Sequence, residues 1–118
     1  MTEAASGSVG ESAPGSVTAV FAALADPRRR EVLDVLARAG RVSATTIAAD
    51  LTVTRQAVTK HLVVLVDAGL ATSSRHGREV LYEVRAAPLD AAARWLQDAA
   101  AVWDRRLDAL KRAAEGAD

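Results

Sequence analysis

Apolar residues recur at helical spacing over most of the chain, and the segment 54–69 divides most clearly into two faces. Val58, Leu62 and Leu65 fall on one stripe of a helix with 3.6 residues per turn. A second stripe, in the first two turns, carries side chains able to contact base edges and phosphates, namely Arg55, Gln56, Thr59 and Lys60. This pattern alone fits equally a helix that enters a DNA groove and an ordinary amphipathic surface helix.

Three shorter helices are predicted before this segment. Ser16 can cap a first helix, whose apolar positions are Val17, Val20, Phe21 and Leu24. Asp26 followed by Pro27 is a strong start signal for a second helix, which Gly40 can end. Ser43 can cap a third helix that runs to about Asp50.

Residues 43–61 satisfy the positional requirements of a helix-turn-helix. Such a unit needs a small residue where its helices cross, apolar residues in the angle between them, and a tight turn. Ala48 supplies the small residue, and Thr54 can cap the second helix after a turn at residues 51–53. The apolar wedge is Ile47, Leu51, Val53 and Val58. The segment 54–69 is therefore predicted to be the second, DNA-reading helix of this unit.

The period changes to two after Gly69, which predicts a β-hairpin. Val80, Tyr82 and Val84 alternate with other residues, and residues 70–74 can form the partner strand with a turn at His76-Gly77. The tip is cationic, with Arg75, His76 and Arg78. A basic hairpin directly after a helix-turn-helix is typical of a wing that contacts the phosphate backbone, although a solvated tip is the simpler alternative.

A last helix is predicted over about residues 88–114, opened by Pro88 and too long for a small domain to cover. Its stripe is expected to pack on a second copy of the chain, together with the first helix. The predicted dimer interface is Val17, Val20, Phe21, Leu89, Ala92, Leu96, Ala99, Trp103 and Leu110. A ligand pocket lined by the two tryptophans is the alternative role for the aromatic residues.

Arg28, Arg29 and Arg30 are unexpected in the first turn of the second helix, because cations there oppose the helix macrodipole. One interpretation pairs Arg30 with Asp34 across one turn and leaves the other two arginines solvated. The other interpretation makes the three arginines phosphate contacts.

Composition and charge bound the remaining possibilities. Residues 1–15 are rich in Ser, Gly and Ala without apolar periodicity, which predicts a disordered arm before a domain at 16–114 and a short tail at 115–118. The net charge is zero, but residues 26–86 carry ten Lys or Arg against seven Asp or Glu, which permits DNA binding. Neither a signal peptide nor a membrane span is evident, so a cytoplasmic protein is expected.

The sequence resembles the ArsR (ArsR/SmtB-type) family of bacterial winged-helix repressors from about Val20 to Leu110. The resemblance rests on Ala-Leu-Ala-Asp-Pro-Arg-Arg-Arg-Glu-Val-Leu at 23–33, Gln-Ala-Val-Thr-Lys-His-Leu at 56–62, Ala-Gly-Leu at 68–70 and Gly-Arg-Glu-Val-Leu-Tyr at 77–82. The segment Val-Trp-Asp-Arg-Arg-Leu-Asp-Ala-Leu at 102–110 is similar to the branch that lacks metal sites, whose members are often autorepressors.

Three departures from the family pattern bear on function. Metal-sensing members carry cysteines where this chain has residues 47–51 without any, and the last helix contains no His, so neither a metal nor a cofactor is expected. Thr52 stands where the family usually has Gly in the tight turn. If the turn requires a positive φ, a β-branched residue there costs about 1 to 2 kcal/mol. Val63 replaces a frequent Lys, which removes one phosphate contact.

The sequence therefore predicts a mainly α (α+β) winged helix-turn-helix protein with four helices, a two-stranded hairpin and a fifth, dimerising helix. Its expected function is that of a homodimeric repressor or autorepressor that binds double-stranded DNA at an imperfect palindrome, with an effector that the sequence does not identify. Contacts with DNA are expected from Thr54, Arg55, Gln56, Thr59, Lys60, Arg75, His76 and Arg78. A winged helix that binds a partner protein is the main alternative. An enzyme is not expected, because neither histidine stands beside a nucleophile, a phosphate loop or a carboxylate pair.

Overall fold

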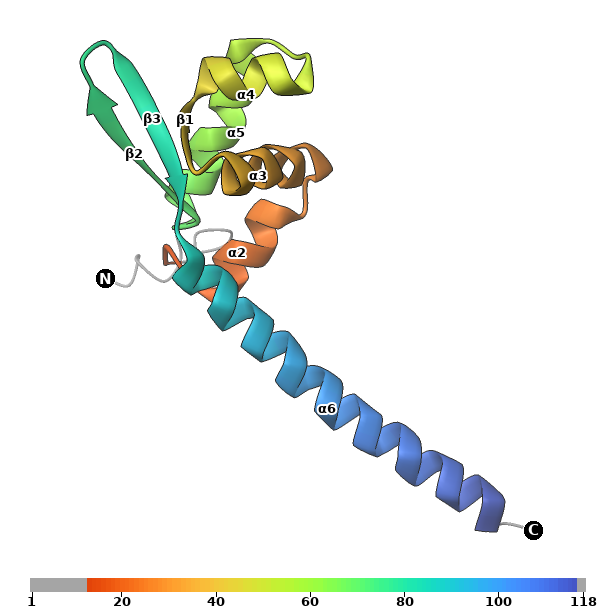
Figure 1. Ribbon diagram of the computed structural model, residues 1–118. Coiled ribbons are helices and arrows are strands. Elements are labelled where there is room, and N and C mark those ends of the chain that lie inside the picture. Colours follow the sequence, from red (N-terminus) through yellow and green to blue (C-terminus); the bar gives the residue numbers. More distant parts are fainter. Residues whose placement is uncertain (1–12, 117–118) are drawn as a thin grey trace, which may run out of the picture.

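The computed structural model describes residues 13–116, which form five helices and three strands (Figure 1). In chain order these are α2 (Val17–Leu24), α3 (Pro27–Ala39), β1 (Arg41–Ser43), α4 (Ala44–Leu51), α5 (Arg55–Asp67), β2 (Ala71–His76), β3 (Glu79–Val84) and α6 (Ala86–Gly116). The predicted winged helix-turn-helix fold is confirmed. None of the helices within these residues is both long enough and apolar enough to cross a membrane.

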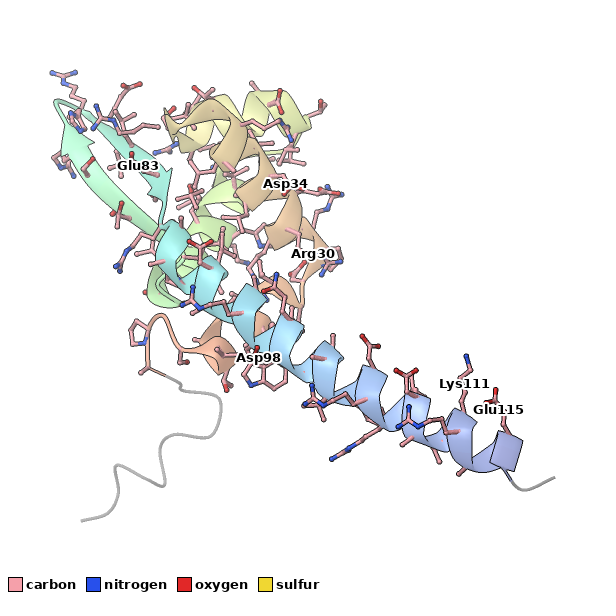
Figure 2. The ribbon with its side chains drawn as sticks, turned by 60° about the horizontal axis from the view of Figure 1, so that its bottom comes forward. Arg30, Asp34, Glu83, Asp98, Lys111 and Glu115 are labelled. Atoms are coloured by element: carbon pink, nitrogen blue, oxygen red, sulfur yellow. The ribbon has the colours of Figure 1, made fainter. Side chains whose placement is uncertain are left out.

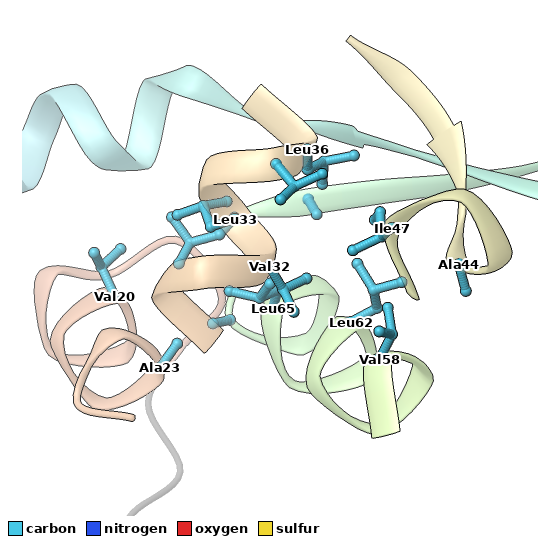
Figure 3. Packing of buried hydrophobic residues seen from close by; sticks show 14 of the residues in the cluster. Val20, Ala23, Val32, Leu33, Leu36, Ala44, Ile47, Val58, Leu62 and Leu65 are labelled. Carbon is cyan, nitrogen blue, oxygen red and sulfur yellow. The ribbon is translucent and has the colours of Figure 1, made fainter. Parts of the chain in front are cut away.

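One hydrophobic core holds the first four helices together (Figure 3). Leu36 of α3, Ile47 of α4 and Leu62 and Leu65 of α5 are fully buried at its centre. Burial of each such side chain stabilises the fold by about 1.5 to 3 kcal/mol. No polar side chain is buried within residues 13–116. The apolar stripe predicted for residues 54–69 thus faces this core, which leaves the polar stripe outside.

Each predicted cap begins its helix. The side-chain oxygens of Ser16, Asp26, Ser43 and Thr54 accept hydrogen bonds from backbone amides two or three residues further on, and these bonds satisfy donors that a helix start leaves unpaired. The distances range from 2.8 Å at Asp26 to 3.3 Å at Ser43. Local sequence is sufficient to set these four starts.

The helices α4 and α5 end in the same backbone motif. At the end of α5, the amide of Leu70 donates to the Leu65 carbonyl at 2.9 Å, and Gly69 has a φ of 85°. At the end of α4, Val53 donates to Ala48 at 3.1 Å, and the left-handed position is taken by Thr52 at φ 57°. The turn therefore does require the positive φ considered from the sequence.

The sheet has three strands, one more than the hairpin predicted. β1 pairs antiparallel with β3, with Val42 opposite Tyr82, so the strand order is β1-β3-β2. The three residues of β1 are too few for a recognisable alternation, and pairing with β3 makes them a strand. The hairpin turn is also shifted, because His76 pairs with Glu79 and leaves Gly77 and Arg78 in the turn.

The long helix begins two residues earlier than predicted and ends two later. α6 starts at Ala86, so Pro88 is its third residue instead of its first. Proline is tolerated there because amides of the first turn have no partner inside the helix. The first part of α6 packs against α2, and its distal part projects away from the other elements (Figure 1).

Residues 1–12 of the predicted disordered arm lie outside the described residues, but its last residues are held against the domain. The amide of Gly15 donates to the carbonyl of Ala68 at 2.8 Å, directly beside Gly69. The fold therefore begins before Ser16. The composition of the arm did not reveal this contact, which depends on the backbone at the end of α5.

Candidate nucleic-acid interface

The first turns of α5 present the polar residues predicted to contact DNA. Arg55, Gln56 and Lys60 are exposed, because Val58 and Leu62 turn the opposite side of the helix into the core. These three side chains are long, and their nitrogen or amide groups can reach base edges or phosphates. The apolar side of α5 thus packs against the core, and its polar side remains exposed to solvent.

Two predicted contact residues are engaged with the helix backbone. The Thr54 hydroxyl accepts the Ala57 amide at 3.1 Å, and the half-buried Thr59 donates its hydroxyl to the Arg55 carbonyl at 2.9 Å. The Thr54 hydroxyl keeps its own hydrogen as a donor, while the hydroxyl of Thr59 retains only acceptor capacity. Arg55, Gln56 and Lys60 therefore have the greater reach.

The hairpin places its cationic tip away from the core. Arg75, His76 and Arg78 are exposed, and the His76 ring is hydrogen-bonded to the Ser74 hydroxyl at 3.0 Å. Gly77 opens the two-residue turn at φ 64°, as a tight hairpin with a glycine in first place requires. In Figure 1 the hairpin tip and α4 lie at the same end of the molecule, opposite the free end of α6.

A groove of about 570 Å³ joins the hairpin to the start of α5. Arg55 and Arg78 lie on it from the two elements, and a carboxylate, Glu79, lies on it as well. Its other lining residues are Ser43, Ala44, Thr45, Thr59, Val80 and Tyr82. The sequence prediction did not include Thr45 or Tyr82, because β1, which brings the start of α4 beside β3, was not predicted.

The arginines at the start of α3 hold the end of α2. Arg29 donates from Nε to the Ala23 carbonyl at 2.6 Å, and Arg30 donates from Nη1 to the Leu24 carbonyl at 2.5 Å. The pairing of Arg30 with Asp34 is therefore wrong, since the guanidinium turns back to α2; Figure 2 labels both residues on α3. These bonds satisfy carbonyls that the end of α2 leaves without a partner.

Asp26 is the acidic residue beside these arginines, between α2 and α3. Its carboxylate accepts the Arg28 amide at 2.8 Å, which is the main reason that its pKa lies below the ordinary value of 3.8. Desolvation opposes this shift, and the positive charge of Arg29 adds to it. Arg29 also lies 3.4 Å from Asp26 Oδ2, and Arg28 pairs with Glu31 at 3.1 Å. These contacts therefore favour the ionised form of the Asp26 carboxylate.

The residues predicted for a dimer interface fall into three groups. Val20 and Ala92 are buried within one chain, where α2 meets α6, and are not accessible to a partner. Val17, Leu89 and Ala99 are half-buried, and Phe21 packs edge-on against Trp95 with 5.7 Å between ring centroids. The exposed remainder lies on α6, where Leu96, Trp103 and Leu110 are 51%, 59% and 66% exposed.

Within residues 13–116, no three side chains of His, Cys, Asp or Glu gather into a group suited to a metal ion. The segment 47–51, where the resemblance implies cysteines in metal-sensing members, lies in α4, and its Ile47 and Ala48 are buried in the core. The Trp95–Trp103 surface is a shallow hollow of about 300 Å³ that Asp98, Ala99 and Val102 complete.

Comparison with known proteins identifies the family. Residues 24–74 match a family model described as a helix-turn-helix domain. The chain is 45% identical to a solved structure described as an ArsR-like transcriptional regulator from Rhodococcus sp. RHA1, with a TM-score of 0.71 over 81% of this chain and 90% of that one. The chain belongs to the ArsR family of transcriptional regulators. The resemblance seen in the sequence is thereby confirmed.

Two further comparisons are with proteins whose descriptions state a role or an assembly. The transcriptional repressor SdpR of Bacillus subtilis is 30% identical over 77 residues, which cover 65% of this chain and 84% of that protein. A solved structure from Mycobacterium bovis, described as a homodimeric winged helix-turn-helix DNA-binding domain, is 31% identical with a TM-score of 0.56 over 77% of this chain and 81% of that one.

Proposed function

We propose that this ArsR-family regulator is a homodimeric repressor that binds double-stranded DNA at an imperfect palindrome. The observation that carries the proposal is the groove in which Arg55 of α5 and Arg78 of the hairpin lie together. A helix with exposed Arg, Gln and Lys in its first turns suits the major groove, and a cationic hairpin beside it suits the adjacent phosphates.

The proposed DNA-contacting residues fall into groups according to the part of the DNA that each can reach. Arg55 can donate two hydrogen bonds to a guanine edge, and Gln56 can pair with an adenine, each worth about 1 to 3 kcal/mol of discrimination. Lys60, Thr54 and Thr59 suit phosphates or nearby bases. The hairpin is expected to contact the DNA backbone through Arg75, His76 and Arg78. We add Thr45 and Tyr82 to the expected contacts, because they line the same groove as Arg55 and Arg78.

Two copies are needed for a palindrome, and α6 supplies a surface for the second one. Its exposed apolar residues lie outside the core of one chain, and a relative of similar fold is described as homodimeric. A two-fold dimer would place its two α5 helices in successive major grooves about 34 Å apart. The name of SdpR, a repressor, supports repression as the direction of control.

The experiment selects bound sequences from random duplexes and then measures the affinity of the full chain for the selected site and for a scrambled one. We expect the affinity to fall steeply with salt, and Arg55→Ala to reduce the preference for the selected site by about tenfold or more. Arg38→Ala, an exposed arginine of α3 paired loosely with Asp50 at 3.9 Å, is the matched control and should keep the preference.

A wild-type chain without any preference between the two duplexes would contradict the proposal. It would favour the alternative, a winged helix that binds a partner protein through α5.

A further inference from the structure

A third pocket, of about 190 Å³, lies between the start of α3, the α4–α5 turn and α5. We call it the turn cavity. Its lining residues come from all three elements and are Arg28, Val32, Leu51, Val53, Ala57, Val58 and His61. None of the functions assigned above uses its interior.

The lining combines an apolar wall with two nitrogen-bearing side chains. Five of the seven residues are aliphatic, while Arg28 and His61 reach the cavity from different helices. Arg28 gives one nitrogen to Glu31, at 3.1 Å, but a guanidinium has five N–H donors. His61 can donate from a ring nitrogen.

Two carboxylates, Asp26 and Glu31, lie beside this pair, but neither lines the cavity. Asp26 accepts the backbone amide of Arg28 and lies 3.4 Å from Arg29, and Glu31 is held by a single nitrogen of Arg28. The cavity itself has no acidic lining residue. An anionic group at Arg28 and His61 would therefore meet donors without displacing a carboxylate from the wall.

The volume limits the size of the occupant. An apolar cavity of about 150 Å³ is enough to hold a benzene molecule. The turn cavity is somewhat larger, and its two polar side chains leave the rest of the wall apolar. The fit is thus to one ring, or to a short branched chain, carrying one anionic group.

We propose that the turn cavity binds a small apolar carboxylate and that its occupancy alters DNA affinity. Arg28 and His61 hold the carboxylate, and Val32, Val53 and Val58 enclose the apolar part. The effect on DNA rests on the proposed function, whereas binding itself does not.

The cavity has a direct mechanical connection to DNA binding. Leu51 and Val53 flank Thr52, whose φ of 57° is strained for a β-branched residue, and Ala57 and Val58 belong to α5. A ligand in this cavity would contact both the turn and α5, and in this proposal it acts on DNA affinity by changing the angle between α4 and α5. By thermodynamic reciprocity, DNA must then alter the affinity for the ligand by the same factor.

The first experiment titrates the full chain, without DNA, with sodium benzoate while the methyl NMR signals of Val32 and Val58 are followed. Benzyl alcohol and benzylamine are the matched neutral and cationic probes. We expect benzoate to shift these signals saturably and to bind about tenfold or more tightly than either probe, because charge-assisted hydrogen bonds are the stronger ones. Failure to saturate, equal binding of the three probes, or the absence of shifts at Val32 and Val58 would overturn the site.

Two variants separate charge from volume. Arg28→Gln removes the cation from an exposed position, and Ala57→Leu fills the cavity without changing charge; both should weaken benzoate binding about tenfold or more. Arg38→Gln on the same helix is the control and should bind as the wild type does. Circular dichroism confirms that each variant folds. Wild-type affinity in both cavity variants would overturn the proposal.

The last experiment measures the ratio of DNA dissociation constants with and without saturating benzoate, on the selected duplex. We expect a ratio that differs from one by about fivefold or more in the wild type and in Arg38→Gln, and a ratio near one in Arg28→Gln. A ratio of one in the wild type with benzoate bound would overturn the regulatory role. Absence of DNA binding by the ligand-free chain would instead contradict the proposed function, while the methyl titration would still decide whether the cavity binds.

Discussion

At the scale of one residue, Thr52 occupies a left-handed backbone position at which the family usually has Gly. The ends of α4 and α5 use the same pair of hydrogen bonds, and the left-handed position is Thr52 in one and Gly69 in the other. A side chain with a branched Cβ is unfavourable at a φ of 57°, whereas glycine is not. The chain therefore stores strain in the turn that leads into α5.

Thr52→Gly should stabilise the protein by about 1 kcal/mol, because relief of the left-handed strain exceeds the extra backbone entropy that glycine loses. Urea unfolding of both proteins measures the difference as a higher midpoint at unchanged slope. Thr45→Gly, inside α4, is the control and should destabilise by a few tenths of a kcal/mol. An unchanged or lower midpoint for Thr52→Gly would contradict the strain.

Asp26 should make stability depend on pH in the acid range. Its pKa in the folded protein lies below 3.8, so the carboxylate contributes fully above that value, and its contribution is lost as the pH falls through the lower folded pKa. Asp26→Asn keeps a capping oxygen but cannot titrate. The difference in unfolding free energy between wild type and this variant should be constant from pH 7 to 5 and shrink towards pH 3. A difference that stays constant to pH 3 would argue against the shift.

At the scale of elements, the junctions are held by backbone contacts between segments distant in sequence. Gly15 is bonded to Ala68, β1 joins β3, and arginines of α3 close the end of α2. The helices themselves were predictable, because each carries an apolar stripe and the first four also carry a cap. The junctions were not, because their partners lie many residues away.

Gly69→Ala should destabilise more than Gly40→Ala, although both glycines have a similar positive φ of 85° and 91°. A Cβ on Gly69 would lie 2.5 Å from the Gly15 backbone nitrogen, while a Cβ on Gly40 meets nothing within 4 Å. A Cβ is unfavourable at the positive φ of both glycines, and Gly69→Ala must also displace residues 14–15. Thermal unfolding compares them; equal losses would show that this contact contributes nothing to stability.

At the scale of the whole molecule, α6 is left largely uncovered by the rest of its own chain. Its 31 residues span about 46 Å at 1.5 Å per residue, and only the first part packs against α2. Side chains of the distal part stand apart from every other element that the structure describes, as the region around Lys111 and Glu115 in Figure 2 shows. A long exposed helix with an apolar stripe is best explained by a second copy.

Trp103→Glu should convert the proposed dimer to a folded monomer, because it places a charge in the apolar stripe of α6 and leaves the core of each chain intact. Light scattering after gel filtration gives the mass, and the affinity for the selected duplex should fall at least tenfold when half of a two-site contact is lost. Gln97→Glu, also exposed on α6, is the control for added charge. A dimer that survives Trp103→Glu would place the interface elsewhere.

The sequence by itself determined the features that are local. Caps at Ser16, Asp26, Ser43 and Thr54 begin their helices, and the apolar stripe of residues 54–69 decides which side of that helix is buried. The alternation at 80–84 is sufficient for a hairpin, and the contiguous motifs are sufficient for the family, since each depends on residues a few positions apart.

Tertiary structure decided the features that depend on distant partners. Only the folded chain shows that Val20 and Ala92 belong to its own core, that Arg30 turns to α2 instead of Asp34, and that Thr45 and Tyr82 line one groove. Periodicity identifies which side of a helix is apolar but not what covers it, because the same stripe can pack within one chain or against another. The turn cavity arises in the same way, from residues on three separate elements.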